Sequence, residues 1–198
     1  MSNELKKKRL VILISGTPGT GKTTIAQYLK KKYSANVLNL TELAIQKDFI
    51  LEIDEERQTK IVDLKKLLPF LESFIPSHQD NLIIEGHYAD VVPDHLTSVF
   101  IILRTEPHIL EKRLKEKKFS PSKILENIQS EILGACTSAA LETHEREKIY
   151  EVDTSNSPVD ETIKTIQFLI ERKPPTNIGK INWMRKLEES NELLRYFP

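Results

Sequence analysis

The residue types best suited to chemistry stand together near the start of the chain, from residue 16 to residue 23. This run reads Gly-Thr-Pro-Gly-Thr-Gly-Lys-Thr, the complete G-x-x-x-x-G-K-[ST] pattern. In such a loop successive backbone N–H groups surround an anion, and the helix that follows adds the positive end of its dipole. Lys22 is placed to reach the β- and γ-phosphates of a nucleotide, and the Thr23 hydroxyl is placed to bind Mg²⁺. We therefore predict that Mg-ATP is bound by Gly16, Thr17, Pro18, Gly19, Thr20, Gly21, Lys22, Thr23 and Thr24.

Two further candidate groups follow apolar runs typical of buried strands. Residues 82–84 end in Glu85 and then His87, and residues 99–103 end in Arg104. Ligands of open parallel sheets bind beyond the carboxyl ends of the strands. We expect Glu85 to hold the Mg²⁺ shell through water, Arg104 to bind phosphate oxygens with its planar fork, and His87 to orient the acceptor. A simple packing role for His87 is an equally good interpretation.

A basic helical pattern and a second helical pattern are separated by a break at residues 119–122. Two helices around a short break, carrying cations, fit a lid over a polyphosphate, which we place at about residues 113–124. Arg113 is the candidate to close on the migrating phosphoryl group. After a last predicted strand, the turn from Asn156 to Pro158 is expected to offer backbone contacts to adenine.

Apolar strand patterns alternate with helical patterns along the chain, which predicts an α/β fold. We expect a P-loop three-layer sandwich with a central parallel sheet. Its core spans residues 1–173, with a mononucleotide-binding insert at about residues 39–75 and the helical lid. Residues 46–60 are mostly polar, which predicts a loop or a hairpin. Residues 174–198 form a linker and helix, for which docking on the core is favoured over a partner surface.

The composition limits the classes of protein. Lysine and arginine balance aspartate and glutamate at 29 each, so no global field points to nucleic acid or a membrane. A single cysteine excludes an internal disulfide and a cysteine-built zinc site. The first apolar stretch is too short for a secretion signal or a membrane span, so we expect a cytoplasmic protein, or a nuclear one in a eukaryote. Residues 6–9 are basic; a solvated flank is favoured over an RNA contact.

Several of these pieces together resemble the adenylate kinases, and within them the branch of the coilin-interacting nuclear ATPase, also called adenylate kinase isoenzyme six, with its archaeal relatives. The pieces are GTPGTGKTT at residues 16–24, EGHYAD at 85–90, VFIILRTEPHILEKRL at 99–114 and KILENIQSEIL at 123–133. The resemblance runs from about residue 10 to residue 170. The phosphate loop points to the superfamily, and the last two segments point to the branch.

The resemblance implies phosphoryl transfer from Mg-ATP to AMP, an ATPase side activity, and maturation of the small ribosomal subunit beside a platform ribosomal protein and pre-ribosomal RNA. Three positions depart from the branch pattern. Glu85 replaces the usual aspartate, Lys117–Lys118 replaces an Arg-Gly pair, and Ile45 stands where a basic residue is common. The alternative function is an ATPase assembly switch with little kinase activity. A small-metabolite kinase is disfavoured because a second Gly-rich substrate loop is missing.

Overall fold

The structure, a computed structural model, describes residues 9–54 and 59–197. Within them a parallel sheet has the strand order β2-β5-β1-β6-β7. Its strands are β1 (Val11–Ser15), β2 (Asn36–Asn39), β5 (Leu82–Glu85), β6 (Val99–Arg104) and β7 (Ile149–Asp153). Continuous apolar runs form the three middle strands because both faces of a parallel sheet are buried. The basic residues 6–8 lie outside the described part of the chain.

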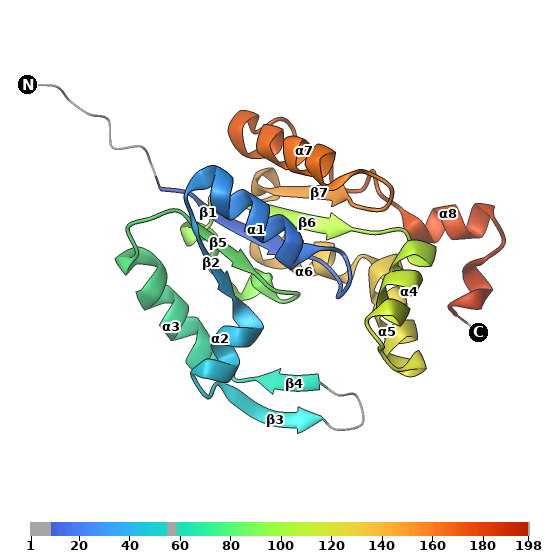
Figure 1. The fold of residues 1–198 in the computed structure, drawn as a ribbon, viewed down its shortest axis with the longest axis horizontal. Coiled ribbons are helices and arrows are strands. Elements are labelled where there is room, and N and C mark those ends of the chain that lie inside the picture. The colour runs from blue at the N-terminus through green and yellow to red at the C-terminus, as the bar shows by residue number, and fades with distance from the viewer. Residues whose placement is uncertain (1–8, 55–58, 198) are drawn as a thin grey trace, which may run out of the picture.

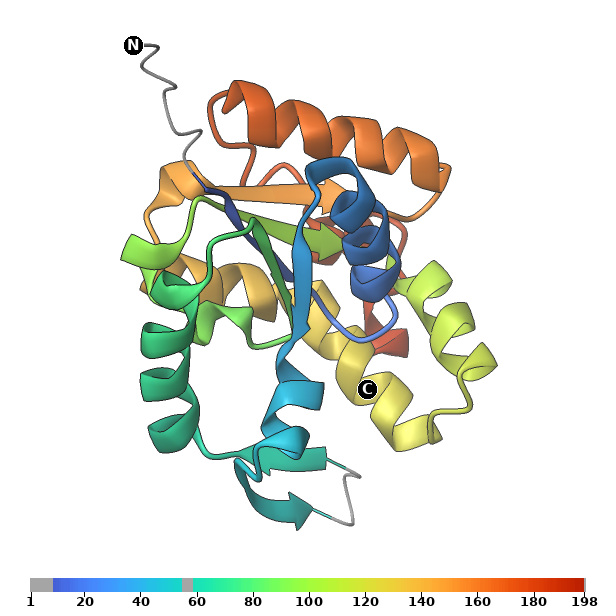
Figure 2. The ribbon, with the colours of Figure 1, turned by 60° about the vertical axis from the view of Figure 1, so that its left-hand side comes forward.

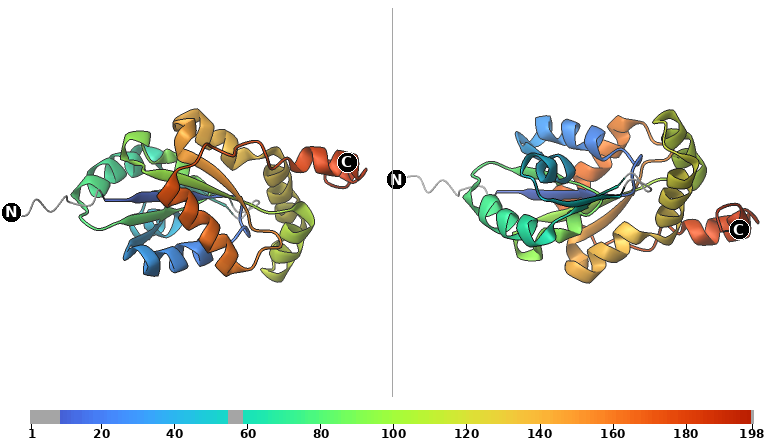
Figure 3. Two further views of the ribbon diagram at one scale, coloured as in Figure 1. Left: turned by 90° about the horizontal axis from the view of Figure 1, so that it is seen from above. Right: turned by 90° about the horizontal axis from the view of Figure 1, so that it is seen from below.

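Helices cover both faces of this sheet, as Figure 3 shows edge-on. One face carries α1 (Lys22–Tyr33) and α7 (Val159–Arg172), and the other carries α2 (Leu40–Gln46), α3 (Leu64–Ser77) and α6 (Ala135–Thr143). Each helix turns an apolar stripe to the strands; on α1 it consists of Ile25, Ala26 and Leu29. The predicted α/β three-layer sandwich with a parallel sheet is confirmed.

Two pieces extend from the carboxyl edge of the sheet (Figures 1 and 2). One is a hairpin of β3 (Ile50–Asp54) and β4 (Thr59–Val62), which are antiparallel. The other is the helix pair α4 (Pro107–Glu116) and α5 (Pro121–Leu133). Pro107 and Pro121 each occupy the first turn of their helix, where the missing N–H is not needed, and Ser120 caps α5.

The last segment packs against the helix pair. It contains α8 (Trp183–Glu189), whose Trp183 and Leu187 are buried in a third apolar cluster with side chains of α4 and α5. Figure 1 shows α8 beside α4 and α5, at the end of the sheet to which β6 and β7 point. Across residues 9–54 and 59–197, no helix has the length and apolar character needed to cross a bilayer.

Candidate active site

The phosphate loop connects β1 to α1, and its backbone has a positive φ at Gly16, Gly19 and Gly21. Gly16 has a φ of 141°, and a Cβ there would lie 2.4 Å from the carbonyl oxygen of Leu103. Gly21 has a φ of 101°, in the left-handed region. Helix α1 begins directly after Gly21. The free N–H groups and the dipole at its N-terminus favour an anion at the loop.

Lys22 lies at the start of α1 and folds back over the loop. Its Nζ donates to the carbonyl oxygens of Gly16 at 2.7 Å and of Thr17 at 3.2 Å. Burial lowers the pKa of Lys22 below its usual 10.5, while nearby Glu85 acts in the opposite direction. A cation held at the loop, with little water around it, is suited to neutralise phosphate oxygens.

Thr23 and Glu85, the two residues predicted for the metal, are in contact. The Thr23 hydroxyl donates to Glu85 Oε1 at 2.9 Å, and Asn39 Nδ2 donates to the same oxygen at 2.9 Å. In the described part of the chain, no cluster of three or more histidine, cysteine or acidic side chains could hold a metal by itself. One hydroxyl and one carboxylate therefore suit Mg²⁺ that arrives with nucleotide oxygens and keeps much of its water.

His87 follows β5 and opens to a cleft beside the phosphate loop. It lines both a cleft of about 230 Å³ over the loop and a neighbouring pocket. Its ring packs edge-on against Tyr88, with centroids 4.7 Å apart. The ring is exposed to the cleft, but the surrounding walls exclude much of the water around it. This desolvation, together with the positive charges of Lys22 and Lys123, lowers the pKa of His87 to about 4. His87 is thus neutral at pH 7.

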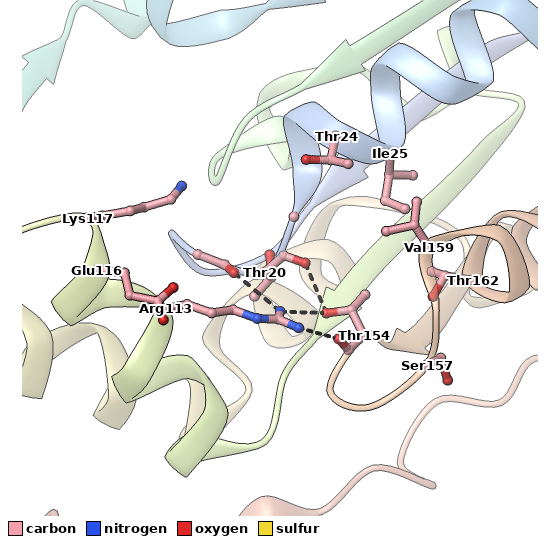
Figure 4. Close-up of a pocket in the computed structure, with 12 residues that line it drawn as sticks. Thr20, Thr24, Ile25, Arg113, Glu116, Lys117, Thr154, Ser157, Val159 and Thr162 are labelled. Carbon is pink, nitrogen blue, oxygen red and sulfur yellow. Dashed lines mark hydrogen bonds between the residues drawn. The ribbon is translucent and has the colours of Figure 1, made fainter.

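On the other side of the loop lies a pocket of about 360 Å³, which we call the α4–α7 pocket (Figure 4). Arg113 lines it and donates to the Thr154 carbonyl at 2.6 Å and the Ser155 carbonyl at 3.3 Å. Arg113 therefore orders the turn after β7 in this structure. Thr154 and Ser157 of that turn line the pocket, whereas the predicted Asn156 is exposed and does not.

The pocket next to His87, which we call the hairpin pocket, has a volume of about 630 Å³. It is lined by residues of the β3–β4 hairpin and of α5, the elements that the sequence predicts as parts of the insert and the lid. Among the described residues its cationic side chains are Lys60 from β4 and Lys123 from α5, and Ile45 lines the wall from α2.

Arg104 is placed differently from the expectation that it would bind phosphate. It is 4% exposed, and its Nε donates to Glu131 Oε1 at 2.7 Å while its Nη1 donates to Glu151. It lines neither the loop cleft nor the two pockets described above. The reason is that two buried carboxylates, on α5 and β7, take its guanidinium away from the sheet edge.

Lys117 was not predicted as a site residue. It follows α4 and lines both the loop cleft and the α4–α7 pocket, and Figure 4 shows it extending from the end of α4 toward the loop. Its charge is one of the influences that lower the pKa of Lys22. The sequence contained one signal for this role, because Lys117 stands at the break between the lid helices where the resembled branch has arginine.

The chain is similar to known proteins over most of its length. The AAA domain family matches residues 12–134. A protein of Methanocaldococcus jannaschii is 35% identical over 180 residues, covering 88% of this chain and 93% of its own. A protein of Pyrococcus abyssi is 33% identical, covering 94% and 98% respectively. Both relatives carry the name "Putative adenylate kinase".

A solved structure of shikimate kinase from Bacteroides thetaiotaomicron superposes with a TM-score of 0.57. It covers 82% of this chain and 98% of that one, at 16% identity. At this identity the likeness concerns the fold, and it agrees with the parallel sheet and phosphate loop described above.

Proposed function

The chain belongs to the same family as these archaeal relatives named as adenylate kinases, and from that premise we propose that it is a Mg-ATP-dependent nucleoside monophosphate kinase. The proposed reaction converts ATP and AMP into two molecules of ADP. Both relatives are matched over nearly their whole length, so the likeness includes the hairpin and the lid as well as the loop.

The observation that best supports this proposal is the continuity of three cavities along the phosphate loop. The α4–α7 pocket shares Gly19, Thr24 and Lys117 with the loop cleft. The loop cleft in turn shares Pro18 and His87 with the hairpin pocket. A donor nucleotide in the first pocket would thus present its γ-phosphate in the cleft, facing an acceptor in the hairpin pocket.

In the proposed reaction the bond between the γ-phosphorus and the β–γ bridging oxygen breaks, and a bond to an AMP phosphate oxygen forms. That oxygen is already deprotonated at neutral pH, so the acceptor needs orientation more than a general base. Neutral His87 is suited to orient it, while Lys22 neutralises the β- and γ-oxygens. Bound Mg²⁺, held through Thr23 and water on Glu85, supplies further charge neutralisation.

We also propose an ATPase activity, in which water replaces AMP beside His87. The lid cation in contact with the cleft is Lys117, and a lysine makes single contacts where an arginine fork makes two. A looser clamp excludes water less well and favours hydrolysis. The resemblance of residues 123–133 supports the finer proposal of the isoenzyme-six branch, with a platform ribosomal protein and pre-ribosomal RNA as partners in the cytoplasm or nucleus.

A label-transfer assay tests the function. Purified protein is incubated with Mg²⁺, γ-labelled ATP and each nucleoside monophosphate in turn, and labelled phosphate release is followed in parallel. We expect rapid label transfer that depends on AMP, and its loss in Lys22→Ala. Slow phosphate release that AMP does not change, and that a ribosomal partner stimulates, would instead favour the assembly switch.

A further inference from the structure

The carboxylate of Glu131 on α5 joins the phosphate loop to the C-terminal segment. It is 2% exposed, and its Oε2 accepts a hydrogen bond from the Thr17 hydroxyl at 2.7 Å. Its Oε1 accepts from Trp183 Nε1 at 3.0 Å, from Arg104 Nε at 2.7 Å and from the Thr105 backbone N–H at 3.1 Å. Three donors on one oxygen fix the rotation of the carboxylate, so the other oxygen stays directed at Thr17.

Trp183 is the first residue of α8 and lies buried in the third apolar cluster. An indole has a single polar group, its N–H, which can only donate. That group is committed to Glu131, an ionised acceptor, and such hydrogen bonds are stronger than neutral ones.

The chain before α8 is anchored without help from Trp183. The Thr176 hydroxyl donates to the Ile149 carbonyl at 2.8 Å, and Asn177 exchanges two hydrogen bonds with the backbone of Glu151 on the edge strand β7. The Gly179 N–H donates to the Glu151 carboxylate at 2.9 Å. Removing the indole N–H therefore leaves the segment in place and removes one hydrogen bond.

We propose that Trp183 is a positioning residue for the phosphate loop, acting through Glu131 on Thr17. Its N–H acts with Arg104 Nε and the Thr105 N–H to hold the Glu131 carboxylate in the orientation that receives the Thr17 hydroxyl. That hydroxyl contact fixes the start of the loop whose N–H groups bind phosphate. Preorganised donors bind and stabilise phosphate charge better than mobile ones. This inference rests on the proposed function only for its consequence on turnover; its consequence on nucleotide binding stands without it.

The test compares Trp183→Phe with Tyr196→Phe. The first keeps an aromatic ring in the cluster and removes the N–H; the second removes a hydroxyl of the same segment that contacts His108 and Glu111, away from the loop. Calorimetry with Mg-ADP should show affinity about threefold to tenfold weaker in Trp183→Phe, less than the full value of a hydrogen bond to a charged group because the lost bond acts on the loop only through Glu131. Tyr196→Phe should bind as the wild type does.

The kinetic readout separates positioning from packing. Trp183→Phe should raise both the KM for ATP and the KM for AMP, because Thr17, which Glu131 holds, begins the phosphate loop and also lines the hairpin pocket. A packing defect would instead lower the unfolding midpoint and leave both KM values of the folded protein unchanged. The two proposals can fail separately. If the wild type transfers no label to AMP, but Trp183→Phe binds ADP more weakly than the wild type, the proposed function is refuted and this inference is supported.

Trp183 is the only tryptophan of the chain, so its fluorescence reports on the link independently. We expect Mg-ADP to change the emission of the wild type and to change it much less in Thr17→Val, which keeps the shape of the side chain but has no hydroxyl. Equal ADP affinity in Trp183→Phe and the wild type, or an equal emission change in Thr17→Val and the wild type, would overturn the proposal.

Discussion

The Thr23 hydroxyl donates to Glu85 Oε1 over 2.9 Å, joining the first turn of α1 to the end of β5 across 62 positions of sequence. The contact arises because β1 and β5 are neighbouring parallel strands, with Ile14 opposite Glu85. The two groups that the sequence assigns to Mg²⁺ thus lie at one point of the sheet edge, beside the loop that binds phosphate.

From this contact we expect Glu85→Gln to weaken metal use selectively. The amide keeps the size and one oxygen but has no charge to hold metal-bound water. The Mg²⁺ concentration for half-maximal label transfer should rise about tenfold, a typical effect of outer-shell partners. Glu42→Gln is the control, because Glu42 is exposed on α2. Identical Mg²⁺ curves for the two variants would remove Glu85 from the metal site.

Lys22→Ala should abolish most turnover and leave the fold intact. The ammonium contacts the loop carbonyls and is the cation we assign to the β- and γ-oxygens, so turnover should fall about 100- to 1000-fold. Lys30→Ala, exposed on the same helix, should behave as wild type. Turnover is measured by ADP formation and folding by circular dichroism; near-normal turnover in Lys22→Ala would refute its assigned role.

His87 should act as a neutral group throughout the physiological range. With its pKa near 4, it gains no proton between pH 8 and about pH 5.5, so the pH profile of kcat/KM should show no step from this residue there. His87→Asn should lower transfer and hydrolysis together, by about tenfold to a hundredfold, with the same profile shape. A step near pH 6.5 that vanishes in His87→Asn would contradict this, and unchanged rates would leave only the packing role.

The same pKa has a consequence for stability. In the folded state the pKa of His87 is about 4, below the pKa near 6.5 that a histidine has in an unfolded chain. As the pH falls, the unfolded state therefore binds this proton before the folded state does. Wild-type stability should therefore fall relative to His87→Asn as the pH decreases from about 6.5 to about 4. Urea unfolding at a series of pH values measures the difference, which should become independent of pH above about pH 7.

Arg104→Met should destabilise the fold. It would leave the carboxylates of Glu131 and Glu151 buried without their cation, which costs about 3–5 kcal/mol of unfolding free energy. Arg146→Met, at an exposed position, should change stability by less than about 0.5 kcal/mol. Denaturant unfolding gives both values. A fully stable Arg104→Met protein that has lost phosphoryl transfer would restore the catalytic role expected from the sequence.

Arg104 also shows where sequence reasoning reached its limit. The strand that carries it, and the edge at which it ends, are fixed by a local apolar run and the rules of parallel sheets. Its partners lie 27 and 47 positions away, on α5 and β7, and no local pattern reveals them. The same holds for the turn after β7, where the sequence located residues 156–158, and with them Ser157, but not that Thr154 would line the pocket and Asn156 would not.

The phosphate loop was predictable for the opposite reason. Its function depends on backbone curvature, which glycine spacing records directly, and on a strand and a helix adjacent in sequence. Glu85 and His87 were located by the strand that precedes them. The apolar side chains of the hairpin, Leu51 and Ile53, are exposed and follow no core pattern. For this reason the sequence did not distinguish a loop from a hairpin at residues 46–60.

We assign to Lys117 the proposed balance between phosphoryl transfer to AMP and hydrolysis of ATP. It is the lid residue that lines both the loop cleft and the α4–α7 pocket, so its ammonium is close to where the triphosphate would lie. Lys117→Ala should slow label transfer about tenfold to a hundredfold with less effect on ADP binding, because a charge on the moving phosphoryl group matters most in the transition state.

Lys117→Arg should act in the opposite direction. A guanidinium holds two phosphate oxygens at once, so the lid should close more tightly and the ratio of label transfer to phosphate release should rise above that of the wild type. Lys118→Ala is the matched control, since its side chain neighbours Lys117 in sequence but lines neither cavity. If Lys117→Ala and Lys118→Ala give the same transfer rate and the same ratio, the lid works without this charge, and the partition between AMP and water must be set in the hairpin pocket.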